Sequence, residues 1–255
     1  MRTKLIAGNW KMNLNLAGAR DLVEQLRSGL SADARVETAI CPPAVYLMPM
    51  AKAVDGSPIQ LGAQNVYHEA SGAFTGEVST AMLADAGCRY VIIGHSERRH
   101  TIGHLESDAD INRKVRATLA ATLRPILCVG ETLSERQAGR TFEVLTFQTV
   151  AGLVGVSAAD SDALVVAYEP VWAIGTGHNA TPAQAQEAHA HIRGCLRRAG
   201  LDADRVRILY GGSLKPDNAA EILSQPDVDG GLVGGASLKA DSFLGIIRAA
   251  LAIGR

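Results

Sequence analysis

The sequence lacks the features that mark nucleic-acid-binding and membrane proteins. Its 255 residues carry a formal net charge of only −1, without the basic excess that either partner would favour. It also contains no apolar run that approaches the roughly 20 residues a helix needs to cross a bilayer. We therefore expect a soluble globular protein with no nucleic-acid partner and no membrane partner.

Cysteine is scarce and widely spaced. Cys41, Cys88, Cys128 and Cys195 form no CxxC pair, so the sequence predicts no zinc site. In a chain of this length, they are expected to pack as small hydrophobic residues rather than to form disulfides. The opening MRTKLIAGNWKMN has only three consecutive apolar residues, which predicts no signal peptide and favours a cytoplasmic location.

Short apolar runs alternate with amphipathic stretches from end to end. Strands that alternate with helices pair in parallel through right-handed crossovers, and continuous apolar runs indicate strands covered on both faces. Eight such units in roughly 250 residues predict a closed (β/α)8 barrel. No proline- or serine-rich linker divides the chain, so we expect one domain over residues 1–255. The strands are expected at 4–10, 36–41, 59–65, 90–95, 124–130, 163–169, 206–212 and 230–235.

The helical segments have recognisable starts. The residue pair Thr181-Pro182 combines a cap residue with a first-turn proline and predicts a helix over 181–199. Further helices are expected to open at Lys215 and to run over 238–252. The alternative architecture is a doubly wound open sheet. It would be expected to carry G-x-G-x-x-G after an early strand, where this chain has AGNWKMN.

Polar side chains gather where three of the predicted strands end. The first strand ends around Asn9 and Lys11, the fourth around His95 and Glu97, and the sixth at Glu169. Each has an ordinary interpretation: a solvated lysine, a packed histidine, or a carboxylate in an ion pair. The carboxyl ends of barrel strands meet at one mouth, however, so a cation, an acid and a base from three strands together indicate a catalytic site.

Glycines follow the last two predicted strands. The segments Gly211-Gly212-Ser213 and Gly234-Gly235 would let the backbone approach a ligand and point its amides inward. The loops after strands seven and eight are the usual phosphate site of this fold, although ordinary turn glycines are the alternative interpretation.

Six motifs resemble the triosephosphate isomerase family in order and spacing over essentially the whole chain. The resemblance implies a TIM barrel that interconverts dihydroxyacetone phosphate and D-glyceraldehyde 3-phosphate, in glycolysis and gluconeogenesis, with no cofactor. The motifs are AGNWKMN at 7–13, IGHSERR at 93–99, CVGE at 128–131, AYEPVWAIGTG at 167–177, YGGSLKPDNAAEIL at 210–223 and DGGLVGGASL at 229–238.

The resemblance also implies residue roles. Glu169 is the expected base that takes a proton from the carbon next to the carbonyl, and neutral His95 donates to the developing oxyanion. Lys11 supplies a fixed positive charge, with Asn9 as its amide partner and Glu97 as a neighbouring acid. The expected phosphate-binding residues are Gly175, Ser213, Gly234 and Gly235.

The apolar loop after Glu169 is expected to be a lid. In the resembling family, a rigid hinge at 170–172 precedes residues that close over the substrate and exclude water. In this sequence, the lid residues are Pro170, Val171, Trp172, Ala173, Ile174, Gly175, Thr176 and Gly177.

The stretch between Asn65 and Ser79, here called the arm, is long for a connection between a strand and a helix. Its Val66, Tyr67 and Phe74 would expose apolar area on a free loop. In the resembling family, this arm docks into a second subunit, with the residue that matches Thr75 touching the partner's active site. We therefore expect a two-fold homodimer, and a loop folded back on its own barrel is the alternative.

Two stretches depart from the family pattern. Residues 100–110, HTIGHLESDAD, are about two residues longer than expected, which puts the local structure around Glu106 in question. His178 and Asn179 replace the lysine and threonine usual at the far hinge of the lid, which predicts altered loop kinetics without altered chemistry.

Two other functions are compatible with parts of this pattern. A different sugar-phosphate isomerase on a barrel would share the phosphate loops but not Lys11 and His95 in these contexts. A catalytically silent barrel that binds a phosphorylated ligand would be expected to have lost Glu169 or His95, and neither is lost.

Overall fold

The computed structural model describes residues 2–31, 33, 35–103, 105–173 and 180–253. Eight parallel strands close on themselves in chain order, and β1 pairs with β8 from Leu5–Gly230 to Gly8–Val233. This closure confirms the barrel and excludes the open sheet. The strands are β1 (Lys4–Asn9), β2 (Val36–Cys41), β3 (Ile59–Ala63), β4 (Tyr90–Ile93), β5 (Arg124–Val129), β6 (Val165–Tyr168), β7 (Arg207–Tyr210) and β8 (Gly230–Val233).

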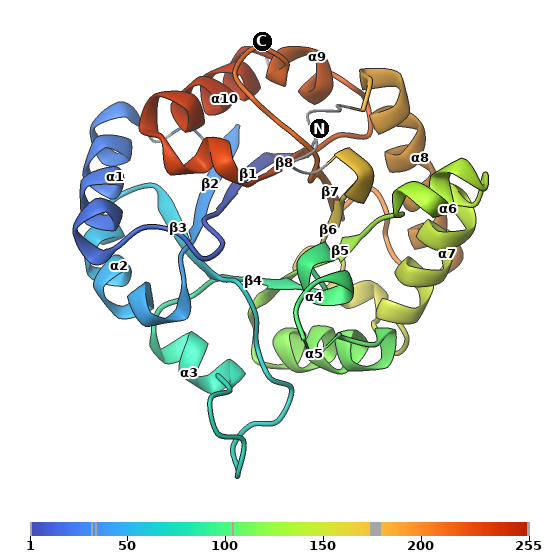
Figure 1. Ribbon diagram of the computed structural model, residues 1–255, viewed down its shortest axis with the longest axis horizontal. Helices are drawn as coiled ribbons and strands as arrows, with labels where there is room; N and C mark the ends of the chain where they lie inside the picture. The colour runs from blue at the N-terminus through green and yellow to red at the C-terminus, as the bar shows by residue number, and fades with distance from the viewer. Residues whose placement is uncertain (1, 32, 34, 104, 174–179, 254–255) are drawn as a thin grey trace.

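Helices form a ring around the barrel (Figure 1). Short 3-10 turns accompany them at Ala44–Tyr46 (η1), Ala158–Asp160 (η2), Val171–Ala173 (η3) and Gly235–Leu238 (η4). The helices are α1 (Leu16–Gly29), α2 (Leu47–Val54), α3 (Thr80–Asp85), α4 (Ser96–His100), α5 (Asp108–Ala120), α6 (Leu133–Gln137), α7 (Thr141–Gly152), α8 (Pro182–Arg198), α9 (Ala219–Leu223) and α10 (Ala240–Ile253).

Most of the helix and strand boundaries in the structure differ from the predicted ones by one to three residues. The start of α8 is as predicted, because Thr181 caps it in a reciprocal pair with Gln184. The start of α9 is not at Lys215, whose N–H instead donates to the Asn218 side chain in a preceding turn. Strand β4 stops at Ile93 because Gly94 turns the chain with a φ of +69°.

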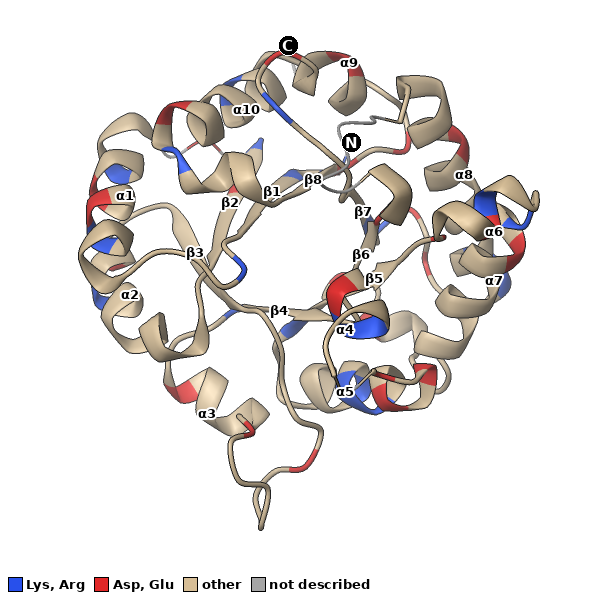
Figure 2. Ribbon diagram, viewed as in Figure 1, with Lys and Arg blue, Asp and Glu red and all other residues tan. Residues whose placement is uncertain are grey.

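The core lies in two layers. Alternate strand residues, among them Leu5, Tyr90 and Leu209, fill the barrel interior, while their neighbours pack outward against the helices. All four cysteines are free and buried, as predicted. Acidic and basic residues are interspersed over the outer helices (Figure 2). None of the helices in the described ranges is both long and apolar enough to span a membrane.

Candidate active site

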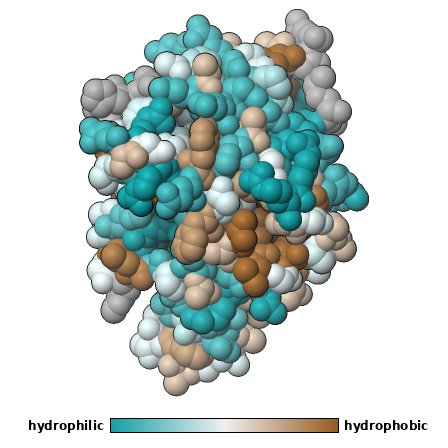
Figure 3. All heavy atoms as spheres, turned by 90° about the vertical axis from the view of Figure 1, so that its right-hand side faces the viewer, coloured by the Kyte–Doolittle hydropathy of each residue, from teal (hydrophilic) through white to brown (hydrophobic). Residues whose placement is uncertain are grey.

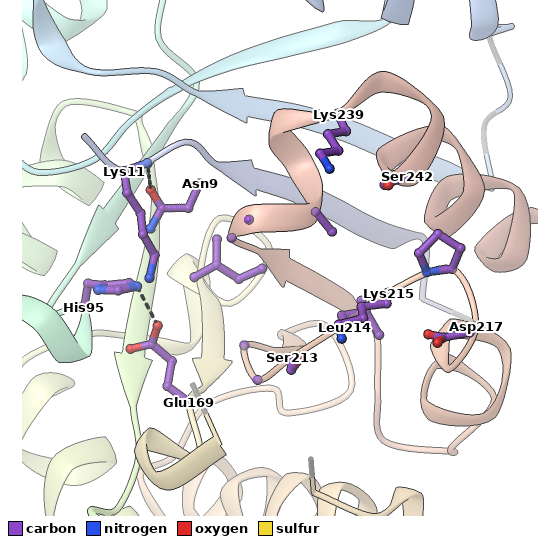
Figure 4. Close-up of a pocket in the computed structure, with 17 residues that line it drawn as sticks. Asn9, Lys11, His95, Glu169, Ser213, Leu214, Lys215, Asp217, Lys239 and Ser242 are labelled. Atoms are coloured by element: carbon purple, nitrogen blue, oxygen red, sulfur yellow. Dashed lines mark hydrogen bonds and ion pairs between the residues drawn. The ribbon is translucent and has the colours of Figure 1, made fainter. Parts of the chain in front are cut away.

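A cavity of about 700 Å³ opens at the carboxyl ends of the strands. Asn9, Lys11, His95 and Glu169 form one side, and the glycine-rich loops after β7 and β8 form the other (Figure 4). We call the four residues of the first side, together with Glu97, the inner wall. The structure therefore brings together side chains that lie as much as 160 positions apart, from Asn9 to Glu169.

Glu169 directly follows β6 and is only 2% exposed. Its carboxylate accepts a hydrogen bond from the Ser96 N–H at 2.8 Å and lies 2.9 Å from His95 Nε2. Burial raises the pKa of this carboxyl, but the contacts with His95 and Ser96 outweigh burial and leave the pKa lowered. The carboxylate is thus held in its charged form against the start of α4.

His95 caps α4 with its own ring. The Glu97 N–H donates to Nδ1 at 3.2 Å, so the ring proton lies on Nε2 and points at Glu169. Burial lowers the pKa of His95, whereas the charge of Glu169 raises it and prevails. We assign the neutral ring, because a protonated Nδ1 could not accept from the Glu97 amide. The imidazole is therefore a neutral hydrogen-bond donor at the cavity.

Lys11 stands in a left-handed backbone conformation, with a φ of +52° that is unfavourable for a residue with a side chain. Asn9 Oδ1 accepts from its N–H at 3.0 Å, and Gln64 Nε2 donates to its carbonyl at 2.8 Å. Its Nζ lies 2.7 Å from Glu97 Oε1. Gln64, which no motif in the sequence marks, also donates to the Cys41 carbonyl and so ties β2 to the end of β1.

Ser213, Gly234 and Gly235 line the opposite side of the cavity. A Cβ on Gly235 would meet no atom of the described residues within 4 Å, so the backbone of Gly235 faces open space. Gly211 and Gly212 are glycines for another reason. A Cβ on Gly211 would lie 2.9 Å from Glu169 Cγ, and one on Gly212 would lie 2.3 Å from the Tyr210 hydroxyl.

The first hinge of the expected lid is anchored by a buried carboxylate. Glu131 accepts hydrogen bonds from Trp172 Nε1 at 2.8 Å and from the Tyr168 hydroxyl at 3.1 Å. Arg136 pairs with Glu131 and lies over the Trp172 ring. In the sequence, Glu131 stands out only as the last residue of CVGE, which predicts no role for it. Its function becomes visible only when β5 lies beside β6.

The remainder of the lid is only partly described. Ala173 is buried at the end of η3, and Pro170 is buried beside it. Ile174, Gly175, Thr176 and Gly177 lie outside the described residues, as does the substituted hinge at 178–179. The phosphate role expected for Gly175 therefore stays a prediction.

The stretch after α4, which is described except for residue 104, brings Glu106 next to two basic side chains. Glu106 forms ion pairs with Arg98 and, at 2.5 Å, with Lys114, whose Nζ also donates to Asn65 at the base of the arm. Ser107 then starts α5 with a capping box. Glu106 is thus part of a buried charge cluster between α4, α5 and the arm.

The arm projects away from the barrel between β3 and α3 (Figure 1). The Tyr67 ring packs against Phe74 with centroids 4.6 Å apart, while Phe74 is 39% exposed and Thr75 is exposed. Val66 adds no exposed apolar area, because it is buried at the arm's base. The arm does not fold back on its own barrel.

A buried carboxylate beside a neutral imidazole and a lysine, at the mouth of a (β/α)8 barrel, is typical of barrel enzymes that transfer protons. The sequence model of one such family, triosephosphate isomerase, matches residues 4–250. The chain belongs to the triosephosphate isomerase family.

Curated relatives match along nearly their whole length. The triosephosphate isomerase of Chloroflexus aurantiacus is 56% identical over 249 residues, covering 97% of this chain and 99% of the relative. Those of Roseiflexus sp. and Moorella thermoacetica are each 54% identical and cover 97% of this chain, with 97% and 98% of their own lengths matched.

Proposed function

We propose that this chain interconverts dihydroxyacetone phosphate and D-glyceraldehyde 3-phosphate by proton transfer through an enediolate. The observation that carries the proposal is the inner wall, where a charged carboxylate, a neutral imidazole donor and a lysine line one cavity. The chain supplies these groups itself, and we propose that it needs no cofactor or metal. In this proposal, residues 1–255 act as one cytoplasmic domain in glycolysis and gluconeogenesis.

In the proposed first step, Glu169 removes a proton from C1 of the substrate. The C–H electron pair forms the C1–C2 double bond, and the carbonyl pair moves onto O2. Before this step, the Glu169 carboxylate must break its contacts with the Ser96 N–H and with His95. This departure removes the contacts that lower its pKa while the burial that raises it remains, so the carboxylate becomes a stronger base.

The freed His95 Nε2–H donates to O2 as negative charge develops there. Lys11 adds a positive charge close by, and Glu97 holds its ammonium group in place. The carboxyl of Glu169 then returns its proton to C2. His95 gives its Nε2 proton to O2 and takes the hydroxyl proton from O1, which gives the aldose and restores the neutral ring. Asn9 contributes by fixing the unusual backbone of Lys11.

The phosphate is proposed to bind at Ser213, Gly234 and Gly235, opposite the inner wall. Support comes from the open space in front of Gly235 and from the place of these residues in the cavity lining. Backbone N–H groups suit a phosphate because they donate hydrogen bonds to its oxygens without a positively charged side chain. The lid begins at the hinge that contains Trp172. Its closure over the substrate would complete the site and exclude water.

We further propose a two-fold homodimer in which each arm docks into the other copy. A second cavity of about 370 Å³ adjoins the inner wall and is lined by Lys11, Glu97 and Val78 among others. Met12, 95% exposed, lies at its edge. A partner's arm would cover this apolar rim and place its Thr75 near Lys11.

The purified chain tests the proposed reaction directly. Dihydroxyacetone phosphate is supplied as the sole substrate, and glyceraldehyde 3-phosphate is measured by coupling to its dehydrogenase. We expect turnover without added metal and full activity in the presence of a chelator. A folded protein that binds the phosphate but shows no turnover would indicate a silent binding barrel instead.

A further inference from the structure

The cavity continues beyond the proposed phosphate-binding residues. It extends between the loop after β7 and the start of α10, where Lys215 and Asp217 face Lys239 and Ser242 (Figure 4). We call this part the outer lobe. Cavities of about 300–1,000 Å³ typically enclose drug-sized ligands. The cavity of about 700 Å³ thus has room for more than a three-carbon phosphate.

The outer lobe concentrates unpaired positive charge. The sequence contains six lysines, and three of them bond to carbonyl or carboxylate oxygens: Lys4, Lys11 and Lys114. Within the described ranges, the ammonium groups of Lys52, Lys215 and Lys239 have neither a hydrogen bond nor an ion pair. Two of these three line the same cavity.

Nearby groups do not cancel this charge. Asp217 is the carboxylate in the outer lobe, so two cations face one anion there. The Ser242 hydroxyl adds a neutral group that can donate a hydrogen bond. An anionic group that enters the outer lobe would therefore meet a net positive charge and available donors.

We propose that the outer lobe is a second anion subsite, which takes the second acidic group of a ligand with two anionic groups on a short chain. The inference rests on the proposed function, because the first anionic group binds at Ser213, Gly234 and Gly235. Bisphosphates and phosphorylated carboxylates belong to this chemical class. Such ligands compete with the triose phosphate and bind across both subsites at once.

The test compares ligands with one and two anionic ends. Alkane bisphosphonates from ethane-1,2-bisphosphonate to hexane-1,6-bisphosphonate are measured as competitive inhibitors, each against the ω-hydroxyalkylphosphonate of the same length. We expect the best bisphosphonate to bind on the order of tenfold more tightly than its matched monophosphonate. The advantage should depend on chain length and shrink at high salt, because the lysines are exposed.

Two variants test whether the tighter binding of the bisphosphonate arises in the outer lobe. In the double variant Lys215→Gln, Lys239→Gln, the affinity ratio of bisphosphonate to monophosphonate should fall towards one. The control Lys52→Gln removes an equally unpaired lysine from α2 and should leave the ratio unchanged. Equal affinities in the wild type, or a ratio that survives in the double variant, would overturn the subsite. Failure of the monophosphonate itself to bind would overturn the proposed function, and the subsite with it.

Discussion

The inner wall and the arm meet at the same barrel mouth but are held in place differently. In the inner wall, the Glu169 carboxylate has the Ser96 N–H and His95 as partners, and Lys11 is fixed from three sides. In the arm, the Tyr67 ring packs on His68 and Phe74, and the tip faces solvent. One chain thus supplies the partners of its own inner-wall residues, whereas the tip of the arm is left exposed, where we propose that a second copy covers it.

The largest effect is expected from substitution of Glu169, the proposed general base in the inner wall. Glu169→Gln keeps the size of the side chain but removes the proton acceptor, and turnover should fall about 1,000-fold. Glu169→Asp retains the carboxylate and withdraws it by one methylene, so the loss should be on the order of 100-fold. A coupled isomerase assay with circular dichroism as the folding control measures both. Wild-type turnover in either folded variant would disprove the assigned role.

Removal of the fixed charge should come next. Lys11→Met preserves the length of the side chain but takes away the ammonium group that pairs with Glu97. We expect turnover to fall on the order of 100-fold, together with weaker substrate binding, because the charge acts on both the bound substrate and the enediolate. Steady-state kinetics that separate kcat from KM check this. Unchanged values of both would contradict the prediction.

A change at the tip of the arm should reduce activity although it alters none of the residues of the inner wall. Thr75→Glu places a charge on the proposed docking surface, which should dissociate the dimer and reduce turnover about tenfold through loss of support for Lys11. Sedimentation velocity and activity are measured on the same sample. Glu69→Gln, an exposed change elsewhere in the arm, serves as the control. A wild type that is monomeric and fully active at micromolar concentration would rule the dimer out.

The smallest effect on turnover, but a large one on stability, is expected at the base of the arm. Glu106→Gln leaves buried Lys114 without its carboxylate, which should lower the free energy of unfolding by about 3 kcal/mol. Burial raises the pKa of Glu106, but Lys114 and Arg98 outweigh burial and lower it.

The lowered pKa sets the pH dependence of this loss. The carboxylate stabilises the fold fully above the unfolded glutamate pKa of about 4.3, and this contribution disappears as the pH falls through the lower folded value. The difference in melting temperature between wild type and Glu106→Gln should therefore be constant near neutral pH and shrink in acid. A difference that grows in acid would contradict this account.

The sequence was sufficient for the architecture because the barrel depends on a repeated pattern. Eight apolar runs such as 36–41, separated by amphipathic segments with capping signals such as Thr181, allow few arrangements other than closure. The ends of the strands were less predictable. A strand stops where its hydrogen bonds stop, and at β4 that point depends on the positive φ of Gly94.

For the candidate site, the sequence determined which side chains stand at strand ends, namely Asn9, Lys11, His95 and Glu169, and the family to which the chain belongs. Only the tertiary structure decided their partners. Gln64 and Glu131 act through contacts between neighbouring strands, which no local pattern records. The state of Glu169 likewise follows from the balance between burial and contacts from the start of α4, 73 positions away along the chain, because a pKa depends on what surrounds a group in space.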